Sequence, residues 1–276
     1  MDGAEIKRNL EREYDIPFVV TKTVEKGEPV FILAPEDKAK ELFSIRVSFR
    51  NRVRLYMDFI PQVYSVPFIR SMSRQSAESR NRFIRYAQLL GKMGAKCSIS
   101  ANGSPLDLEN TESWPEEWND FRLRVTKMPI EAEGEFEYSE VANSWGSLMM
   151  GMVLSLADIV SVEDPDETEG YREGDVRRTE INRYERNPLN RKLCLSAKGY
   201  DCAVCGMNFE KTYGEIGHHF IHVHHIVPVS QLGPGYIIDP IKDLVPVCPN
   251  CHAMLHRKDP PYLPNEIKEK LLLSYI

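Results

Sequence analysis

The sequence has no histidine in its first 217 residues, and only two cysteines, Cys97 and Cys194, occur before position 202. It also has no run of 18 or more apolar residues, so no transmembrane helix is expected. The charged N-terminal segment lacks the apolar stretch of a signal peptide. We therefore expect a cytoplasmic protein with no membrane partner, in which paired cysteines hold metal more often than they form disulfides.

The net charge of −6 hides two regions of opposite sign. Between Leu42 and Lys96 there are eleven basic residues and two acids, whereas the range 107–175 has nineteen acids and four basic residues. The basic region favours a nucleic-acid partner in spite of the overall acidity. The alternative is that the two regions neutralise each other across an internal interface.

The first 160 residues have the pattern of an α+β domain, with the order β-β-α-β-β-α after some forty residues that suggest a charged helix and short extended pieces. No known family is indicated for this part. The elements that the apolar periodicity predicts are strands over 43–49, 53–59, 96–100 and 121–126, and helices over 67–92 and 139–160.

The predicted 67–92 helix has a basic face opposite its apolar face. Its apolar side carries Met72, Phe83, Tyr86 and Leu90. The opposite side carries three arginines that are candidate DNA-binding residues, namely Arg70, Arg74 and Arg85.

An acidic stretch rich in turn-forming residues, 161–175, has almost nothing to bury and is interpreted as a linker. It separates a recognition or sensor domain over 1–160 from a second domain over 176–276. Asn187, Pro188 and Gly199 have the positions of an N-cap, a first turn and a stop for a helix over 188–198. Two arginines make this approach basic and are further candidate DNA contacts, Arg186 and Arg191.

The four remaining cysteines form two C-x-x-C pairs, Cys202/Cys205 and Cys248/Cys251, separated by 42 residues. This is the spacing of a structural zinc site in which each pair forms a tight turn around the ion. Buried free thiols would not need to occur as spaced pairs, whereas the isolated Cys97 and Cys194 are expected in the core.

All seven histidines lie between positions 218 and 256. His224 and His225 occupy a predicted strand, and His252 and His256 are four residues apart on a helix that Pro249 can start. Because His252 is rotated by about 100° from Cys251 on that helix, the histidines can serve a different site from the cysteines. Two imidazoles on the helix and one on the strand can bind a divalent metal. Together with the four cysteines they exceed the ligand number of one ion, so two metal sites are predicted.

The succession C-x-x-C, V-H-H-I-V-P and D-L-V-P-V-C-P-N-C-H-A-M-L-H resembles the HNH nuclease family of the zinc-containing ββα-metal type. The segments R-N-P-L-N-R, G-Y-D-C-A-V-C-G and Y-G-E-I-G resemble the HNH domains of methylation-dependent and related restriction endonucleases. The resemblance covers residues 176–258 and does not extend to residues 1–160.

The resemblance implies a role for each histidine of the motif. His224, His252 and His256 would bind a catalytic ion, either Mg²⁺ or another divalent transition metal. His225 would be the general base, and Asp243 would take the place of the family's frequent asparagine and orient His225. His222 is the second candidate ligand, and His218 and His219 are expected in a loop near DNA.

These observations predict a metal-dependent DNA endonuclease of restriction or anti-phage defence, whose N-terminal domain selects the target. One alternative is a nuclease gated by a partner protein or small ligand at residues 1–160. Another is a zinc-bound DNA-binding module that does not cut. A homodimer and partner proteins of a defence system are further expectations.

Overall fold

The computed structural model describes seven stretches of the chain, over 3–36, 42–62, 65–130, 137–157, 187–226, 236–258 and 260–273. The chain divides into two compact units, Met1–Ser161 and Val162–Ile276. The predicted acidic linker over 161–175 and Arg186 lie outside the described residues.

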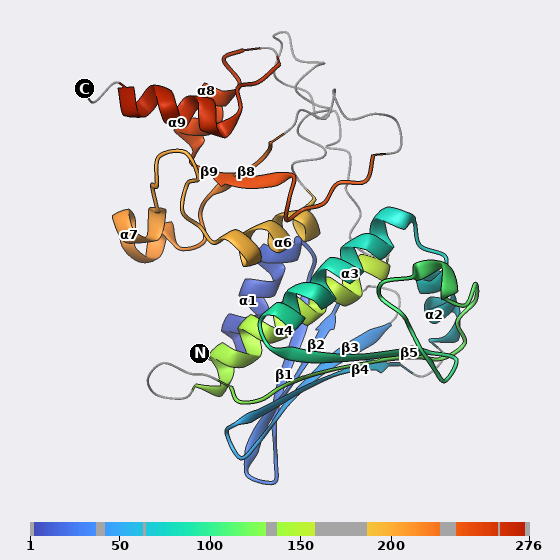
Figure 1. The fold of residues 1–276 in the computed structure, drawn as a ribbon. Helices are drawn as coiled ribbons and strands as arrows, with labels where there is room; N and C mark the ends of the chain where they lie inside the picture. Colours follow the sequence, from blue (N-terminus) through green and yellow to red (C-terminus); the bar gives the residue numbers. More distant parts are fainter. Residues whose placement is uncertain are drawn as a thin grey trace, which may run out of the picture. The chain divides into compact units, whose positions relative to one another are not determined.

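Unit 1 (Met1–Ser161) has a seven-stranded antiparallel sheet with the strand order β1-β2-β3-β4-β7-β5-β6. Helices α1, α3 and α4 lie on one side of this sheet (Figure 1). The elements are α1 (Gly3–Tyr14), β1 (Phe18–Glu25), β2 (Glu28–Pro35), β3 (Phe43–Arg50), β4 (Arg54–Pro61), α2 (Val66–Ser73), α3 (Ala77–Lys92), β5 (Ala95–Ala101), β6 (Ser104–Pro105), the 3₁₀ turn η1 (Thr111–Ser113), β7 (Phe121–Lys127) and α4 (Tyr138–Ala157).

The α+β class and all four predicted strands are confirmed, but the element order is richer than the expected β-β-α-β-β-α. The extended pieces of the first forty residues are a regular hairpin, β1-β2, that forms one edge of the sheet. Lys26 and Gly27 both have positive φ in its two-residue turn, the conformation that matches the twist of antiparallel strands. The prolines do not prevent this pairing, because Pro29 and Pro35 lie near the ends of β2.

The single helix predicted over 67–92 is two helices, α2 and α3. Helix α2 ends at Ser73, and α3 begins after Ser76, whose hydroxyl accepts a hydrogen bond from the backbone N–H of Ser79. Such an N-cap satisfies one of the free N–H groups at the start of a helix. The sequence prediction missed this second start because the apolar periodicity continues across residues 73–76. Met72 and Phe83 are nevertheless buried as predicted.

Helix α4 is the central helix of unit 1, because it packs against α1, α2, α3, β2 and β3. Its residues from Gly146 to Ala157 are buried on all sides of the helix. Small residues allow this enclosure. At Gly151 the hydroxyls of Tyr14 and Tyr86 lie so close to the helix that no side chain would fit.

Unit 2 (Val162–Ile276) contains a short antiparallel pair of strands, β8 (His222–His225) and β9 (Leu244–Val247), followed by α8 (Pro249–Leu255). Helix α6 (Pro188–Lys198) confirms the predicted bounds, and the Asn187 side chain accepts hydrogen bonds from the backbone N–H groups of Leu189 and Asn190. The remaining elements are α7 (Phe209–Tyr213), the 3₁₀ turn η2 (Gly214–Gly217) and α9 (Pro264–Leu273).

Among the residues that the structure describes, none of the helices has the length and apolarity that crossing a bilayer requires.

Gly151→Ala should destabilise unit 1 by about 1–3 kcal/mol, the usual cost of overpacking a dense core. A methyl group there would lie 2.8 Å from the Tyr14 hydroxyl oxygen and closer still to Tyr86. Gly91→Ala is the matched control, because a methyl group at this exposed position of α3 meets nothing within 4 Å. Gly91→Ala should raise the free energy of unfolding of unit 1 by about 0.5 kcal/mol. All three tryptophans lie at 114, 118 and 145, so urea unfolding followed by their fluorescence reports on this unit. Equal stability of the two variants would contradict the packing described for α4.

Candidate metal centres and active site

Strand β8 and helix α8 bring three histidines together. His224 lies on β8 and is 2% exposed, whereas His252 and His256 are one helical turn apart at α8. One ring nitrogen from each lies within 4.8 Å of those of the other two. The Nε2 atoms of His252 and His256 are 3.3 Å apart. Three converging imidazoles are a donor set that binds a divalent metal and leaves positions open for water or substrate.

The four cysteines of the two C-x-x-C pairs form the second cluster. Their sulfur atoms all lie within 4.8 Å of one another, and Cys205 Sγ is 3.8 Å from Cys248 Sγ. Cys202, Cys248 and Cys251 are buried, and Cys205 is exposed. Four thiols at these separations fit the tetrahedral coordination of a structural zinc ion. The cluster has no residue in common with the three-histidine cluster, although Cys251 and His252 are consecutive.

Backbone N–H groups point at the thiols, as expected for the tight turn of each pair. The Cys251 N–H donates to Cys248 Sγ over 3.4 Å. Burial raises the pKa of Cys202, but backbone N–H donors at Cys205, Cys248 and Val204 outweigh it and leave this pKa below its ordinary value. Burial also raises the pKa of Cys251, and hydrogen bonds with the Cys248 and Cys205 thiols raise it further. A bound cation would favour the thiolate at every one of these positions.

Of the two other cysteines, Cys194 is a core residue, as predicted, but Cys97 is only partly buried and lies outside the core. Cys194 is fully buried in α6, and Cys97 is half-buried with its sulfur 3.9 Å from the carbonyl oxygen of Ala87. Burial raises the pKa of each thiol to about 11. Neither belongs to a candidate metal cluster.

The buried His225 directly follows His224 on β8 and is 4% exposed. Its register partner on β9 is Leu244, which directly follows Asp243. The Asp243 carbonyl accepts the N–H of Ile226, which ties this loop to the end of β8. Asp243 Oδ2 accepts hydrogen bonds from the Tyr236 hydroxyl and the Asp239 N–H, both over 2.8 Å. The structure therefore holds Asp243 in place, while its predicted action on His225 stays a prediction.

Tyr236 and Asp239 are the residues of this loop that sequence analysis missed. The available signal was the Asp239-Pro240 dipeptide, a frequent start of a turn. Asp239 Oδ1 accepts the N–H of Ile241 over 3.1 Å in that turn. The Asp243 carboxylate raises the pKa of Tyr236, so its hydroxyl stays protonated and continues to donate.

His222 lies beside the histidine cluster and is not one of its three members. Its Nδ1 atom is 3.1 Å from Nδ1 of His252. His252 thus has one ring nitrogen at hydrogen-bond distance from His222 and the other beside His256. His218 and His219 follow the turn η2, where His218 contacts Glu210 and the His219 ring stacks on Tyr200.

The arginines predicted to bind DNA have other contacts in this structure. Arg70 and Arg74 both form ion pairs with Glu117, at 2.9 and 3.1 Å. Arg85 donates to Gln88. Arg191 is half-buried in α6, where burial lowers its pKa. The Glu117 contacts are those that the internal-interface alternative requires, and DNA binding by these arginines stays a prediction.

The fold of unit 2 and its two clusters define the class of this domain. The model of the HNH endonuclease family matches residues 202–258, which include both clusters, so the chain carries an HNH endonuclease domain. Among curated proteins, the chain is similar to the type IV methyl-directed restriction enzyme EcoKMcrA of Escherichia coli strain K12. The two are 33% identical over 88 residues, which are 30% of this chain and 30% of that relative. No solved structure matches the chain.

Cys202→Ser should remove the metal held by the four thiols and unfold the HNH domain, because a structural site supplies much of the folding free energy of so small a core. Cys97→Ser is the matched control and should leave metal content unchanged. Metal per chain measured by mass spectrometry, with limited proteolysis, checks both variants. Folded wild-type protein that contains no tightly bound metal would contradict the assignment.

Proposed function

We propose that the chain is a metal-dependent DNA endonuclease of restriction or anti-phage defence, whose N-terminal unit recognises the target. The observation that carries the proposal is the group of His224, His252 and His256, with the buried His225 directly after His224 on β8. This group lies inside the residues that match the HNH endonuclease family. Similarity to a restriction enzyme over 88 residues supports the biological role.

The donor set of the histidine cluster suits a divalent transition metal better than Mg²⁺, because imidazole nitrogen is a good ligand for the former and Mg²⁺ prefers oxygen. His224, His252 and His256 would hold this ion through one nitrogen each. When bound, the ion stabilises negative charge on the phosphoryl and leaving oxygens. The four thiols would hold Zn²⁺, with a purely structural role.

In the proposed reaction, His225 acts as the general base. Its neutral imidazole takes a proton from a water molecule as the water oxygen forms a bond to phosphorus. The bond from phosphorus to the 3′ oxygen breaks, and that oxygen takes a proton from solvent. The expected products are therefore a 5′-phosphate and a 3′-hydroxyl. Burial of His225 supports the role, since a base that is held in one position needs no reorganisation.

The direct test of this function is cleavage of plasmid DNA, with and without cytosine methylation. Reactions with Mn²⁺, Mg²⁺ or no added divalent ion should show cutting that depends on the ion and is faster with Mn²⁺. A folded, zinc-loaded protein that cuts neither plasmid with either ion would argue for the non-cleaving module instead.

His225→Ala should slow cleavage by a factor on the order of 10² or more, the usual scale for a general base. Zinc content, melting temperature and DNA affinity should stay close to wild type. His218→Ala is the control, because this exposed loop histidine lies outside the three-histidine cluster and should leave turnover at saturating DNA little changed. Wild-type cleavage by His225→Ala would remove His225 as the base and direct attention to His222.

His222→Ala should weaken binding of the catalytic ion by about 10- to 100-fold, the usual effect of removing a group that orients a metal-bound histidine. His222 Nδ1 is at hydrogen-bond distance from His252 Nδ1 and would fix the tautomer in which Nε2 faces the ion. Titration calorimetry with Mn²⁺ on zinc-loaded protein gives the affinity, and His256→Ala provides the scale for removal of a direct ligand. A His222→Ala affinity equal to wild type would exclude this role.

A further inference from the structure

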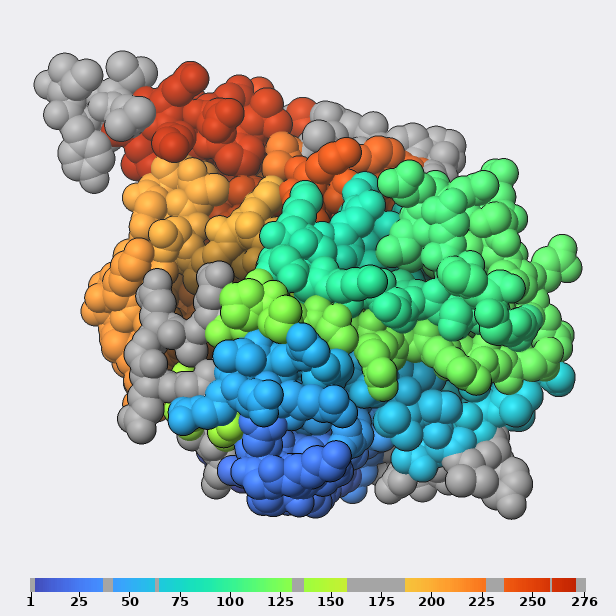
Figure 2. All heavy atoms as spheres, turned by 60° about the horizontal axis from the view of Figure 1, so that its bottom comes forward, coloured from blue at the N-terminus to red at the C-terminus, as the bar shows by residue number. Residues whose placement is uncertain are grey.

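Among the described residues of unit 1, one face of the sheet carries no helix (Figure 1), and a polar row crosses its centre. The strand register places Arg46 directly opposite Asp58 and Asp58 directly opposite Arg124. Neighbouring residues on each strand, such as Val47, Met57 and Val125, are fully buried and belong to the other side. We call this helix-free side the open face. Figure 2 looks onto it, where the blue strands β1–β4 adjoin the green and teal of β7 and β5.

Two hollows adjoin on the open face. One, of about 690 Å³, lies over the hairpins β1-β2 and β3-β4, and the other, of about 930 Å³, lies over β4, β7 and β5. Arg46, Asp58 and Arg124 line both. With neighbouring strands roughly 4.8 Å apart, the surface from β2 to β5 is about 19 Å wide. Each hollow alone has the size of a small-ligand pocket, so the pair suits an extended ligand.

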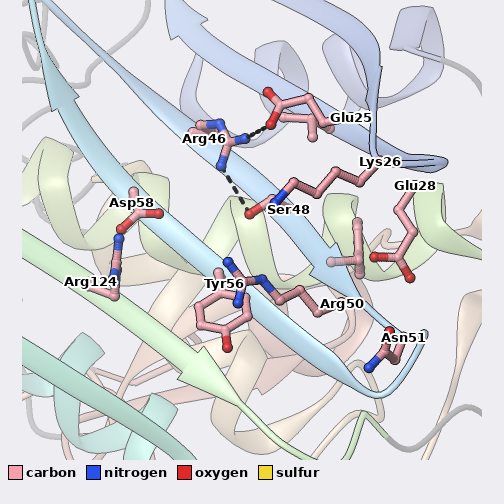
Figure 3. A pocket seen from close by; sticks show the side chains of 12 residues that line it. Glu25, Lys26, Glu28, Arg46, Ser48, Arg50, Asn51, Tyr56, Asp58 and Arg124 are labelled. Carbon is pink, nitrogen blue, oxygen red and sulfur yellow. Dashed lines mark hydrogen bonds and ion pairs between the residues drawn. The ribbon is translucent and has the colours of Figure 1, made fainter.

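The side chains at the bottom of these hollows, which we call the floor, are less exposed to solvent than those at the edge, which we call the rim. On the floor, the side chain of Asp58 is 15% exposed and that of Arg46 is 28% exposed. On the rim, Arg124 and Arg122 are 59% and 78% exposed. Asp58 accepts from Arg124, and Arg46 pairs with Glu25 and donates to Ser48 (Figure 3). The floor therefore has donors and an acceptor in fixed positions, and the rim has cations that can reach outward.

Tyr56 adds an aromatic surface to the first hollow. The Arg50 guanidinium lies 5.4 Å from the centre of its ring. Figure 3 shows the two side chains next to each other. Arg54 Nη1 donates to the Tyr56 hydroxyl over 3.2 Å. An arginine and an aromatic ring side by side are a combination that stacks on bases and neutralises phosphates.

The charges of the two hollows favour an anionic ligand. Five cations line them, Lys26, Arg46, Arg50, Arg122 and Arg124, against three acids, Glu25, Glu28 and Asp58. The highly exposed Arg122 also pairs with Asp120 over 3.2 Å. Helix α2 has a positive excess as well, because Arg70 and Arg74 share the single carboxylate of Glu117. The excess of the open face differs in that it lies at ligand-sized hollows.

We propose that the open face is the surface on which the N-terminal unit binds DNA. Three exposed arginines, Arg50, Arg122 and Arg124, contact backbone phosphates and hold the DNA in register. The floor, with Asp58 and Arg46, faces base edges, where a carboxylate accepts from an exocyclic amine and a guanidinium donates to ring and carbonyl acceptors. The inference rests on the proposed function, and it assigns recognition to the sheet and not to helices α2 and α3.

Two matched double variants of the full-length protein test it, Arg50→Gln/Arg122→Gln on the open face and Arg70→Gln/Arg74→Gln on α2. Fluorescence anisotropy with a 30-base-pair duplex, without added divalent ion, is measured over a range of NaCl concentrations. The open-face variant should bind at least tenfold more weakly at physiological salt. Its slope of log affinity against log salt should be shallower by about two, because each substitution removes one arginine that neutralises a phosphate. The α2 variant should keep both affinity and slope.

Melting temperatures separate binding from folding. The open-face variant loses one highly exposed ion pair, Arg122–Asp120, and should melt close to wild type, whereas the α2 variant loses both ion pairs of Glu117 and should melt lower. Ser98→Glu provides a second, charge-adding variant, since Ser98 lies opposite Arg124 in the second hollow and should also weaken binding. The inference is overturned if Arg50→Gln/Arg122→Gln binds the duplex with wild-type affinity. It is also overturned if only the α2 variant binds the duplex more weakly. Wild-type protein that binds in this manner but cuts no plasmid overturns the nuclease proposal alone.

Discussion

The convergence of four cysteine thiols is the constraint on which the C-terminal unit depends. Cys248 belongs to this cluster and is also the N-cap of α8, where its sulfur accepts the N–H of Cys251. The start of the helix is therefore fixed by the cluster, and with it the direction in which His252 and His256 point. Two backbone hydrogen bonds support the first cysteine pair. The Cys202 N–H donates to the Met207 carbonyl, and the Ala203 N–H donates to the carbonyl of Pro246 in β9. Structural and candidate catalytic sites thus share one small scaffold.

Unit 1 is organised around a different constraint, the enclosure of α4 between the sheet and three helices. Because all the helices that pack on α4 need the same side of the sheet, the other side is left with alternating polar residues from β3, β4 and β7. The hydroxyls of Tyr14 and Tyr86 are buried at the centre of this packing, and burial raises the pKa of both. Tyr14 satisfies its hydroxyl by donating to the carbonyl of Ser147 over 2.6 Å.

Local signals could be predicted from the sequence, and long-range neighbours could not. The α6 helix followed from Asn187, Pro188 and Gly199, and the four-cysteine cluster followed from the spacing of its two pairs, because caps and tight turns act over a few residues. The choice of His224 as the strand member of the histidine cluster came from the family resemblance. The pairing of β7 with β4 and the pairing of Arg70 with Glu117 join residues that are far apart in the sequence, such as Asp58 with Arg124. The contact of His222 with His252 likewise depends on how β8 meets α8. No periodicity contains that information.

The adjacency of Cys251 and His252 also determines how much variation α8 can tolerate. The seven residues of this helix lie between Cys248, its N-cap, and His256, its C-cap. Cys248 and Cys251 belong to one cluster and His252 and His256 to the other, while Leu255 is fully buried. An inserted or deleted residue would turn one ligand pair by about 100° relative to the other and separate the two sites. Ala253 and Met254 are exposed and outside both clusters, so drift of the sequence in this helix should concentrate there.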